Sequence, residues 1–387
     1  MIAYGVFSST DDHSPRVAAR IGLNIIDLAR LCELGVLDKI NLAYFTSNSL
    51  NDFIRQGYSF RQIVKQAVEQ VVDTVTNDPH SELMAAVFAL NQVKLYMPVK
   101  IGGYTDFYAS KQHATNIGKI FRPDNPLMPN WVHMPIAYNG RASSVVVSGH
   151  PVKRPHGQIL VDGSPQFDCC KKLDFEVELG VVIGKDSVLG EPINIDNAAE
   201  HIFGVCVVND WSARDIQAWE YQPLGPFNSK SFLTSISAFI VPLEELSAYK
   251  VEAQPQDPQP LPYLQDKNAH SYDIRLEVRL ATAKCHEGIV IGRSNFQDIY
   301  WTMSQWIAHH TVTGCNLKVG DLLASGTISG NERGNLGSLM ELTINGKESI
   351  ELPNGEQRTF LENGDSIIID AYCGHEIIGE VSGTVVK

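Results

Sequence analysis

A short acidic stretch, residues 173–179 (LDFEVEL), alternates apolar and charged side chains with a period of two. That period is typical of a half-buried β-strand, in which successive side chains point to opposite faces. Asp174, Glu176 and Glu178 are therefore predicted to share one face, with neighbouring carboxylates about 6–7 Å apart. Like charges at that spacing raise one another's pKa unless a positive charge lies between them. A divalent cation held by oxygen ligands would resolve the conflict; the alternative is a solvated acidic face on an edge strand.

Asp210 follows a second apolar run, residues 203–208, which predicts a buried strand. A carboxylate at the end of such a strand has a rigid support from which it can reach a site. In the helix predicted to follow, Arg214, Gln217 and Tyr221 lie at i, i+3 and i+7 and so share one face as three hydrogen-bond donors. The alternative is that Asp210 and Arg214 form an ion pair that caps the helix, with Gln217 left solvated.

A carboxylate, a phenol and an imidazole (Asp106, Tyr108 and His113) fall within eight residues at a predicted loop-to-helix junction, where Ser110 can cap the helix. Histidine is the first candidate for a general base, because its charge changes near neutral pH. A histidine at a helix start can also be a surface or capping residue. No G-x-S-x-G elbow occurs, so the sequence does not support catalysis by a Ser-His-Asp triad.

Glu341 interrupts an apolar run, residues 339–342, that predicts a strand. A glutamate in that setting is costly unless it is paired or hydrogen-bonded. A histidine partner would satisfy the carboxylate and be oriented by it, although the sequence alone does not identify that histidine as His113. The alternative is a glutamate on the solvated face of the strand.

The overall charge limits the partners of this chain. It carries a formal net charge of −13 and no cluster of Lys and Arg, so neither nucleic acid nor an anionic membrane surface is an expected partner. An anionic substrate would therefore need cations placed inside a site. Lys230 is one candidate, although a lysine after a stiff loop such as residues 223–229 (PLGPFNS) is usually solvated.

Length and cysteine usage indicate a cytoplasmic globular protein. The 387 residues suffice for two domains. We find no basic segment followed by an apolar core at the N-terminus, as a secretory signal would have, and no apolar run approaches the roughly 20 residues needed to span a bilayer. The seven cysteines are scattered, with no C-x-x-C pair and no zinc-site spacing, which favours reduced thiols.

The first of two predicted units covers residues 1–97. Residues 4–7 and 21–28 are typical of short strands or of a strand that leads into a helix. Apolar positions recur at helical spacing over residues 51–72, with Asn51 as a candidate cap. This unit offers no chemistry of its own, and a structural role is expected.

The second predicted unit, residues 98–387, is rich in strands and turn signals. Asn345-Gly346 lies between two apolar segments, which predicts a hairpin there. Residues 298–311 predict a helix with aromatic positions toward a core. No glycine-rich phosphate loop follows a strand, so nucleotide binding has no support.

Six motifs of the second unit, in this order along the chain, resemble the fumarylacetoacetase family. They are YTDFYASKQHATN (104–116), LMPNW (127–131), GRASSVVVSG (140–149), LDFEVE (173–178), NDWSARDIQAWEYQPLGPF (209–227) and DLLASGTISG (321–330). The resemblance runs through nearly all of the second unit, and the first unit is similar to the small N-terminal domain of that family.

The resemblance implies a mainly β (α+β) protein. Residues 1–97 would form an SH3-like barrel, and residues 98–387 a mixed β-sandwich roll of the family's C-terminal type, assembled as a homodimer. It further implies hydrolysis of the carbon–carbon bond of 4-fumarylacetoacetate, a small diketo dicarboxylate, to fumarate and acetoacetate. This is the last step of tyrosine and phenylalanine breakdown, and it uses a divalent cation, Mg²⁺ or Ca²⁺.

Carried over position by position, the resemblance also implies roles for individual residues. The metal carboxylates would be Asp106, Glu176, Glu178 and Asp210, with a second cation contact at Lys230 and Thr234. His113 would be the base that activates water, Glu341 would orient it, and Arg214, Gln217 and Lys230 would stabilise developing negative charge. The substrate would contact Tyr108, Arg122, Tyr138, Gln217, Tyr221 and Thr327.

Two features depart from the family pattern. Asp174 is not a metal ligand in the family, although the alternation places it with Glu176 and Glu178. Leu233 stands where the family has glycine, between Lys230 and Thr234, and its side chain could disturb a backbone that approaches the second cation closely. The alternatives to fumarylacetoacetate hydrolysis are a related reaction, such as acylpyruvate hydrolysis or oxaloacetate decarboxylation, and a non-catalytic metal-binding scaffold.

Overall fold

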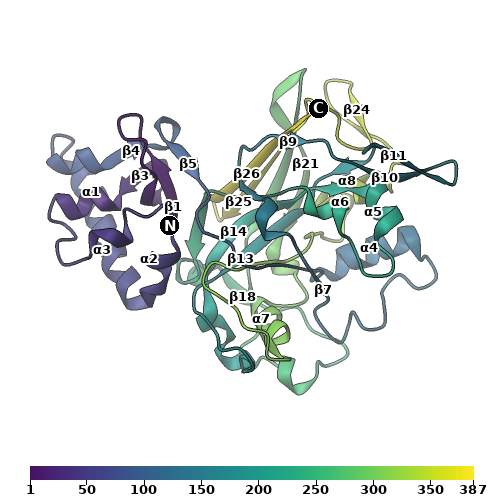
Figure 1. Cartoon of the computed structure of the whole chain (residues 1–387), viewed down its shortest axis with the longest axis horizontal. Helices are drawn as coiled ribbons and strands as arrows, with labels where there is room; N and C mark the ends of the chain where they lie inside the picture. The colour runs from purple at the N-terminus through teal and green to yellow at the C-terminus, as the bar shows by residue number, and fades with distance from the viewer.

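The computed structural model describes residues 1–387 and is built mainly of strands, with helices at both ends of the molecule (Figure 1). The N-terminal region contributes strands β1 (Ile2–Ser8), β2 (Arg16–Ile21), β3 (Asn24–Asp27), β4 (Val87–Ala89) and β5 (Lys94–Tyr96), and helices α1 (Leu28–Glu33), α2 (Asn51–Arg55) and α3 (Gly57–Asn77). No helix in the structure combines the length and apolarity needed to cross a membrane.

The remaining strands come from the second unit. They are β6 (Tyr104–Phe107), β7 (Ala137–Asn139), β8 (Val145–Val147), β9 (Val152–Lys153), β10 (His156–Val161), β11 (Ser164–Cys169), β12 (Leu173–Asp174), β13 (Val177–Ile183), β14 (Ile202–Asp210), β15 (Ser212–Ala213), β16 (Thr234–Ile236), β17 (Phe239–Pro242), β18 (Lys250–Glu252), β19 (His270–Tyr272), β20 (Arg275–Thr282), β21 (Cys285–Asn295), β22 (Leu322–Ala324), β23 (Ile350–Glu351), β24 (Gln357–Arg358), β25 (Ser366–Cys373) and β26 (Glu376–Val386). Its α-helices are α4 (Lys111–Phe121), α5 (Arg214–Glu220), α6 (Asn228–Ser231), α7 (Met303–Thr311) and α8 (Leu339–Leu342).

Two sheets form the framework. The larger one has 13 strands and a main path β4-β3-β2-β1-β17-β14-β13-β22-β6-β7, with β5, β8 and β16 joined to it. Its central pairs, β13 with β14 and with β22, are antiparallel, whereas β22 and β6 are parallel. The second sheet has the order β21-β20-β25-β26-β9. The prediction of a mainly β protein with mixed sheets and some helices is confirmed.

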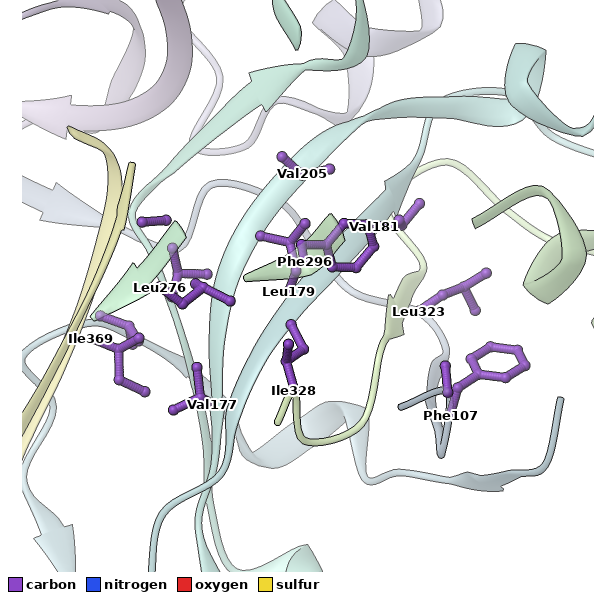
Figure 2. Packing of buried hydrophobic residues seen from close by; sticks show 14 of the residues in the cluster. Phe107, Val177, Leu179, Val181, Val205, Leu276, Phe296, Leu323, Ile328 and Ile369 are labelled. Atoms are coloured by element: carbon purple, nitrogen blue, oxygen red, sulfur yellow. The ribbon is translucent and has the colours of Figure 1, made fainter. Parts of the chain in front are cut away.

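The larger sheet is buried on both of its faces near its centre. On one face, Val181 and Val205 belong to the same hydrophobic cluster as Leu276 and Ile369 of the second sheet (Figure 2). On the other face, Val182, Phe203 and Val208 pack in a cluster with Tyr4, Phe53 and other residues of the N-terminal region. Two covered faces explain why β13 and β14 are long apolar runs rather than alternating segments.

The acidic stretch at residues 173–179 lies inside the protein. It is divided between β12 and β13, and every one of its side chains is buried, including Asp174, Glu176 and Glu178. The expected half-buried strand is therefore wrong in its exposure, and so is the alternative of a solvated edge strand. Alternation was a poor guide here because the second face is covered by protein, not by water.

The N-terminal strands extend the large sheet instead of closing on themselves. Strands β4, β3, β2 and β1 pair in that order, β5 pairs with β1, and β1 continues to β17 of the second unit. The expected SH3-like barrel is not confirmed, because the structure shows no closed ring of strands in this region.

The helix expected over residues 51–72 is two helices, α2 and α3, because Gly57 follows α2 with a positive φ of 81°. Asn51 is not the cap: Leu50 occupies that position, and the Asn51 amide instead donates to the carbonyls of Lys100 and Val319. Asn51 thus ties α2 to the second unit.

The expected strand over residues 339–342 is the helix α8, and no hairpin forms at Asn345-Gly346. Asn345 and Gly346 both have positive φ values in the turn that follows the helix. The hairpin lies further on, where β23 and β24 flank Asn354-Gly355. The helix expected over residues 298–311 begins later, at Met303, where Thr302 and Gln305 form a capping box.

Candidate active site

Four buried carboxylates meet at one end of the adjacent strands β14, β13, β22 and β6. Asp106 is in β6, Glu178 is in β13, Asp210 ends β14, and Glu176 lies between β12 and β13. Strand β22 joins β6 to β13, since Ala324 is the register partner of both Asp106 and Gly180. Each of the four offers a carboxylate oxygen, and these oxygens lie within 4.8 Å of one another. We refer to Asp106, Glu176, Glu178 and Asp210 as the carboxylate cluster.

Two cations neutralise part of this cluster. The Lys230 ammonium donates to Glu176 and, at 2.7 Å, to Oδ2 of Asp210. Arg214 Nη1 lies 2.7 Å from Oε1 of Glu176. Burial alone would raise the pKa of Glu176, but Lys230 and Arg214 outweigh it and hold that pKa well below its ordinary value. The protein itself therefore partly balances Glu176, through both cations, and Asp210, through Lys230.

Glu178 has no such partner. Neither of its buried carboxylate oxygens is hydrogen-bonded. Burial raises the pKa of Glu178 well above its ordinary value, and the charges of Asp106 and Asp210 raise it further. The pKa of Asp106 is also raised, by burial and then by Asp210, even though Gly326 N–H donates to Asp106 Oδ1 at 3.0 Å. A buried carboxylate without any donor is rare in proteins and points to a missing partner.

A divalent cation fits this arrangement. Four carboxylates face only Lys230 and Arg214, so at least two negative charges remain unbalanced. The donors are all oxygens, which Mg²⁺ and Ca²⁺ prefer over nitrogen or sulfur. The orphaned oxygens of Glu178 are available without breaking any hydrogen bond. The site can therefore hold a divalent cation.

A buried histidine–glutamate pair lies beside the cluster. Ser110 caps α4 by accepting from His113 N–H, and His113 Nδ1 lies 2.8 Å from Glu341 Oε2. Because an ionised carboxylate only accepts hydrogen bonds, Nδ1 carries the proton and Nε2 keeps its lone pair. His113 lies in the first turn of α4, the helix that follows β6 and its Asp106.

Glu341 is held by several donors besides the imidazole. Its Oε2 accepts from Ser329 Oγ and Ser338 Oγ, each at 2.9 Å, and its Oε1 accepts from Asn116 Nδ2 at 2.9 Å. Burial opposes ionisation, but His113, Asn116 and Ser329 outweigh it, and the pKa of Glu341 is lowered. The alternative of a solvated Glu341 is wrong, because this side chain is buried.

The alternatives of a capping ion pair between Arg214 and Asp210 and of a solvated Lys230 are also wrong. Lys230 is only 6% exposed, because α6 directs it into the carboxylate cluster. Arg214 pairs with Asp174 and Glu176 rather than with Asp210, and its Nη1 donates to Gln217 Oε1 at 3.2 Å. Gln217 is therefore a partner of Arg214 and not an unattached surface residue.

Several other predicted residues border the cluster. Tyr138 donates to Asp210 Oδ2 at 2.7 Å, and Thr234 donates to Asp210 Oδ1 at 2.9 Å. The Tyr108 ring meets the His113 ring edge-on, with 5.3 Å between their centroids. Leu233 is buried in the hydrophobic core. A second cation contact at Lys230 and Thr234 stays a prediction.

Arg122 and Thr327 keep unused donors. Arg122 Nε and Thr327 Oγ1 are buried without a hydrogen-bond partner, as is Arg214 Nη2. Tyr221, by contrast, is 41% exposed at the C-terminal end of α5, and its hydroxyl accepts from Gln222. The structure does not bring Tyr221 into the carboxylate cluster.

Sequence reasoning missed the residues that hold Glu341 and Arg214 in place. Ser338 and Glu341 have the S-x-x-E spacing of a helix start, a signal that could have identified α8. Ser329, Asn116 and Asp174 carry no comparable signal, because their partners are far away in the chain.

We expect Gly326→Ala to lower cation affinity and turnover by about tenfold or more. Gly326 has a φ of +71°, and a Cβ there would lie 2.1 Å from the carbonyl oxygen of Phe107, next to Asp106. The loop must shift, which moves the N–H that Asp106 accepts. Calorimetric titration with Mg²⁺ or Ca²⁺ and an activity assay measure both effects.

Gly364→Ala is the matched control for this substitution. Gly364 has a φ of +92° but open space where the Cβ would lie, so alanine there carries the backbone strain without the clash. The control should lose stability but keep its cation affinity. Equal cation affinity in the Gly326 and Gly364 variants would contradict the prediction.

The carboxylate cluster, which can hold a divalent cation, and the histidine–glutamate pair lie together on a mixed β fold. The chain matches the family model described as fumarylacetoacetate (FAA) hydrolase C-terminal over residues 103–386, and the model described as fumarylacetoacetase N-terminal over residues 2–98. It therefore belongs to the fumarylacetoacetate hydrolase family.

Full-length relatives agree with this assignment. The chain is 44% identical to a fumarylacetoacetase of Arabidopsis thaliana over 398 residues, covering 100% of this chain and 94% of that protein. It is 45% identical to a fumarylacetoacetase of Homo sapiens over 397 residues, covering 99% and 94%. A solved fumarylacetoacetate hydrolase from Exiguobacterium antarcticum is 16% identical, with a TM-score of 0.57, and the match covers 100% of this chain and 99% of that chain. This last likeness shows the fold alone.

Proposed function

We propose that this chain hydrolyses the carbon–carbon bond of 4-fumarylacetoacetate and releases fumarate and acetoacetate. The observation that carries the proposal is the position of the His113–Glu341 pair beside the carboxylate cluster, with Lys230 and Arg214 at its edge. The identity of 44–45% to fumarylacetoacetases over 99–100% of this chain supports the same substrate.

His113 acts as the general base of the reaction. Its Nε2 takes a proton from water, and the resulting hydroxide oxygen attacks the carbonyl carbon at the fumaroyl end of the scissile bond. Glu341, which accepts from Nδ1, fixes the tautomer and stabilises the imidazolium that forms. When the bond breaks, its electron pair leaves with the acetoacetate carbon as an enolate. The proton held on His113 Nε2 then passes to that carbon, which restores the neutral imidazole.

Negative charge develops twice, first on the attacked carbonyl oxygen and then on the enolate. We assign the stabilisation of this charge to Lys230, Arg214 and Gln217, which contact the carboxylate cluster or one another. Asp106, Glu176, Glu178 and Asp210 would hold a divalent cation, Mg²⁺ or Ca²⁺, which when bound supplies Lewis-acid polarisation of the carbonyl.

The two carboxylates of the substrate need donors that the folded protein has not used. Arg122 Nε and Thr327 Oγ1 are buried and unpartnered, and Tyr108 borders His113. We assign the substrate contacts to these residues, with Tyr138 near the cation and Tyr221 at the exposed rim.

The proposal predicts cation-dependent turnover. The purified protein should remove the ultraviolet absorbance of fumarylacetoacetate, lose that activity in excess chelator, and regain it when Mg²⁺ or Ca²⁺ is restored. An absence of turnover with both cations would refute the proposal. Faster turnover of an acylpyruvate would favour the related reaction. Cation binding without turnover of either substrate would favour a non-catalytic scaffold.

We also propose that the protein is a cytoplasmic homodimer. Within each chain, the boundary between the two units would lie near residues 97 and 98. All seven cysteines are free thiols, which fits a reducing compartment. Phe167 on the β10–β11 hairpin and Leu224 and Phe227 after α5 expose large apolar side chains, which a partner subunit would cover in the proposed dimer. Light scattering coupled to size exclusion tests the dimer.

A further inference from the structure

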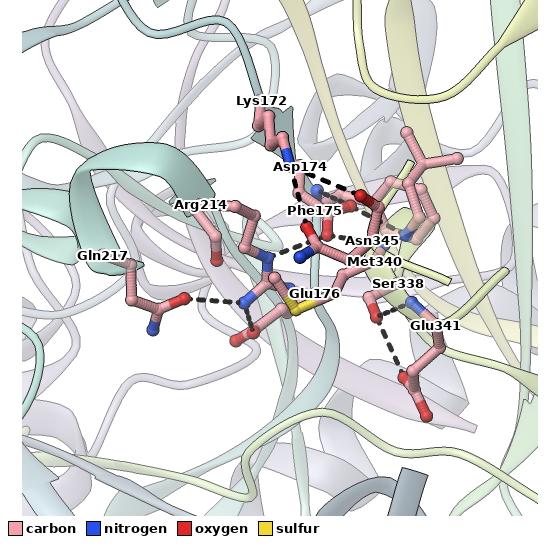
Figure 3. Close-up of polar contacts among 12 residues, drawn as sticks. Lys172, Asp174, Phe175, Glu176, Arg214, Gln217, Ser338, Met340, Glu341 and Asn345 are labelled. Atoms are coloured by element: carbon pink, nitrogen blue, oxygen red, sulfur yellow. Dashed lines mark hydrogen bonds and ion pairs between the residues drawn. The ribbon is translucent and has the colours of Figure 1, made fainter. Parts of the chain in front are cut away.

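Asp174 is a fully buried carboxylate that lies outside the carboxylate cluster. Its Oδ1 accepts from the N–H groups of Phe175, at 2.9 Å, and Leu339, at 2.8 Å. Its Oδ2 accepts from Arg214 Nε, at 2.9 Å, and from Met340 N–H, at 3.0 Å. Figure 3 shows Asp174 between Arg214 on one side and the start of α8 on the other. One carboxylate thus contacts two separate parts of the site.

The first contact fixes the plane of the Arg214 guanidinium. With Nε on Asp174, Nη1 reaches Glu176 and Gln217, and Nη2 is the donor left over. The guanidinium is flat and its donors are rigidly spaced, so holding Nε determines where Nη2 points. Asp174 therefore determines the direction of Arg214 Nη2, the donor that has no partner in the structure.

The second contact fixes the start of α8. The first N–H groups of a helix have no partner within the helix, and here Leu339 and Met340 donate theirs to Asp174. Ser338 accepts the next one, from Glu341. The carboxylate of Glu341 then holds His113. Asp174 thus contacts Met340, the residue that precedes Glu341, and Glu341 orients His113.

The chemistry of the contacts requires a carboxylate at this position. All four partners are donors, so an ionised carboxylate satisfies each of them. Asparagine has the same shape, but its NH₂ group would face two N–H donors in either orientation.

We propose that Asp174 is a positioning residue that fixes Arg214 and the Glu341–His113 pair in their positions relative to each other. This inference deepens the proposed function and rests on it. It also assigns a role to Asp174, the acidic residue of the 173–179 stretch that lies outside the carboxylate cluster and is not solvated. Asp174 acts through its neighbours and does not contact the substrate.

Asp174→Asn tests the proposal. We expect kcat for fumarylacetoacetate to fall about 10- to 100-fold, the usual effect of losing a residue that supports a site from behind. KM should change less than threefold, because Arg122 and Thr327 are untouched. Affinity for Mg²⁺ or Ca²⁺, measured by calorimetry, should also stay within threefold, because the carboxylate cluster is intact.

Asp365→Asn is the matched control. Asp365 is equally buried and accepts from Arg358 Nε at 2.8 Å and from Arg358 Nη2 at 3.0 Å, in a region with no predicted site residue. This variant should lose thermal stability while its kcat stays within about twofold of the wild type. If Asp174→Asn also keeps kcat within twofold, or loses cation affinity in step with kcat, the proposal is overturned.

A second pair of variants covers the case in which Asp174→Asn does not fold. Leu339→Pro and Leu339→Ala both remove the leucine side chain, but only proline removes the N–H that Asp174 accepts. Proline is tolerated at the first position of a helix, and Ser338 has the extended backbone (φ −152°, ψ 155°) that must precede it. We expect a kcat at least threefold lower for proline than for alanine; equal values overturn the proposal.

The wild-type protein separates the two levels of inference. If the wild type does not turn over fumarylacetoacetate, the proposed function fails. If the wild type is active and the Asp174 and Leu339 variants behave like their controls, only the role of Asp174 fails.

Discussion

Replacing His113 with alanine is expected to lower kcat by about 10²–10⁴-fold, the usual contribution of a general base. The imidazole is buried and its Nδ1 is held by Glu341, which leaves Nε2 as the basic atom. Cation affinity should change little, because the carboxylate cluster does not include His113. Steady-state kinetics and calorimetric titration of the same preparation measure both quantities.

The His113→Ala protein should still fold. Glu341 keeps three donors, from Asn116, Ser329 and Ser338, so its charge is not left unpaired. His309→Ala is a suitable control, because His309 is also partly buried and hydrogen-bonded, to the Tyr263 hydroxyl. Retention of more than a tenth of wild-type kcat by the His113 variant would exclude His113 as the base.

Glu178→Gln is expected to weaken divalent-cation binding by about 100-fold and, in the same experiment, to raise the melting temperature of the cation-free protein. The carboxylate of Glu178 is buried without a donor, so removing its charge relieves a cost that only a bound cation would otherwise offset. A cation at 100 times its dissociation constant stabilises the folded state by about 2.7 kcal/mol. Most of that stabilisation should disappear in the variant.

Thermal unfolding with and without Mg²⁺ or Ca²⁺ measures both effects. Asp370→Asn is the control, because Asp370 is as buried as the cluster residues but is paired with Arg279. The control should lose stability without cation and keep the stabilisation that the cation adds. A Glu178 variant that melts lower than the wild type in chelator, or that gains as much from the cation, would contradict the assignment of Glu178 as a ligand.

Residue patterns predicted some local features of the fold well. The apolar run at residues 203–208 is the buried strand β14, and Ser110 caps the helix that begins before His113. These features depend on side chains close together in the sequence. Residues 339–342 resemble a strand because they are apolar, but the S-x-x-E spacing from Ser338 to Glu341 is that of a helix start, and the structure has the helix α8 there.

The assembly of the candidate site was less accessible to pattern reasoning. Glu176 and Glu178 are neighbours in the sequence, but Asp106 and Asp210 join them only because β22 links β6 to β13 and β13 pairs with β14. The grouping of these four residues came from the family resemblance and not from the alternation. The alternation alone gave Asp174 the same role as Glu176 and Glu178, because it cannot show that Asp174 turns toward α8.

Because the N-terminal strands share a sheet with β13 and β14, the N-terminal region supports the candidate active site from behind. Phe203 and Val208, on the strand that ends at Asp210, pack in one hydrophobic cluster with Tyr4 and Phe53. Deleting the N-terminal region would therefore expose an apolar surface on the strand that carries Asp210, a candidate cation ligand. Substitutions that disrupt α3 or β1 can therefore lower turnover without changing any residue assigned to the substrate contacts.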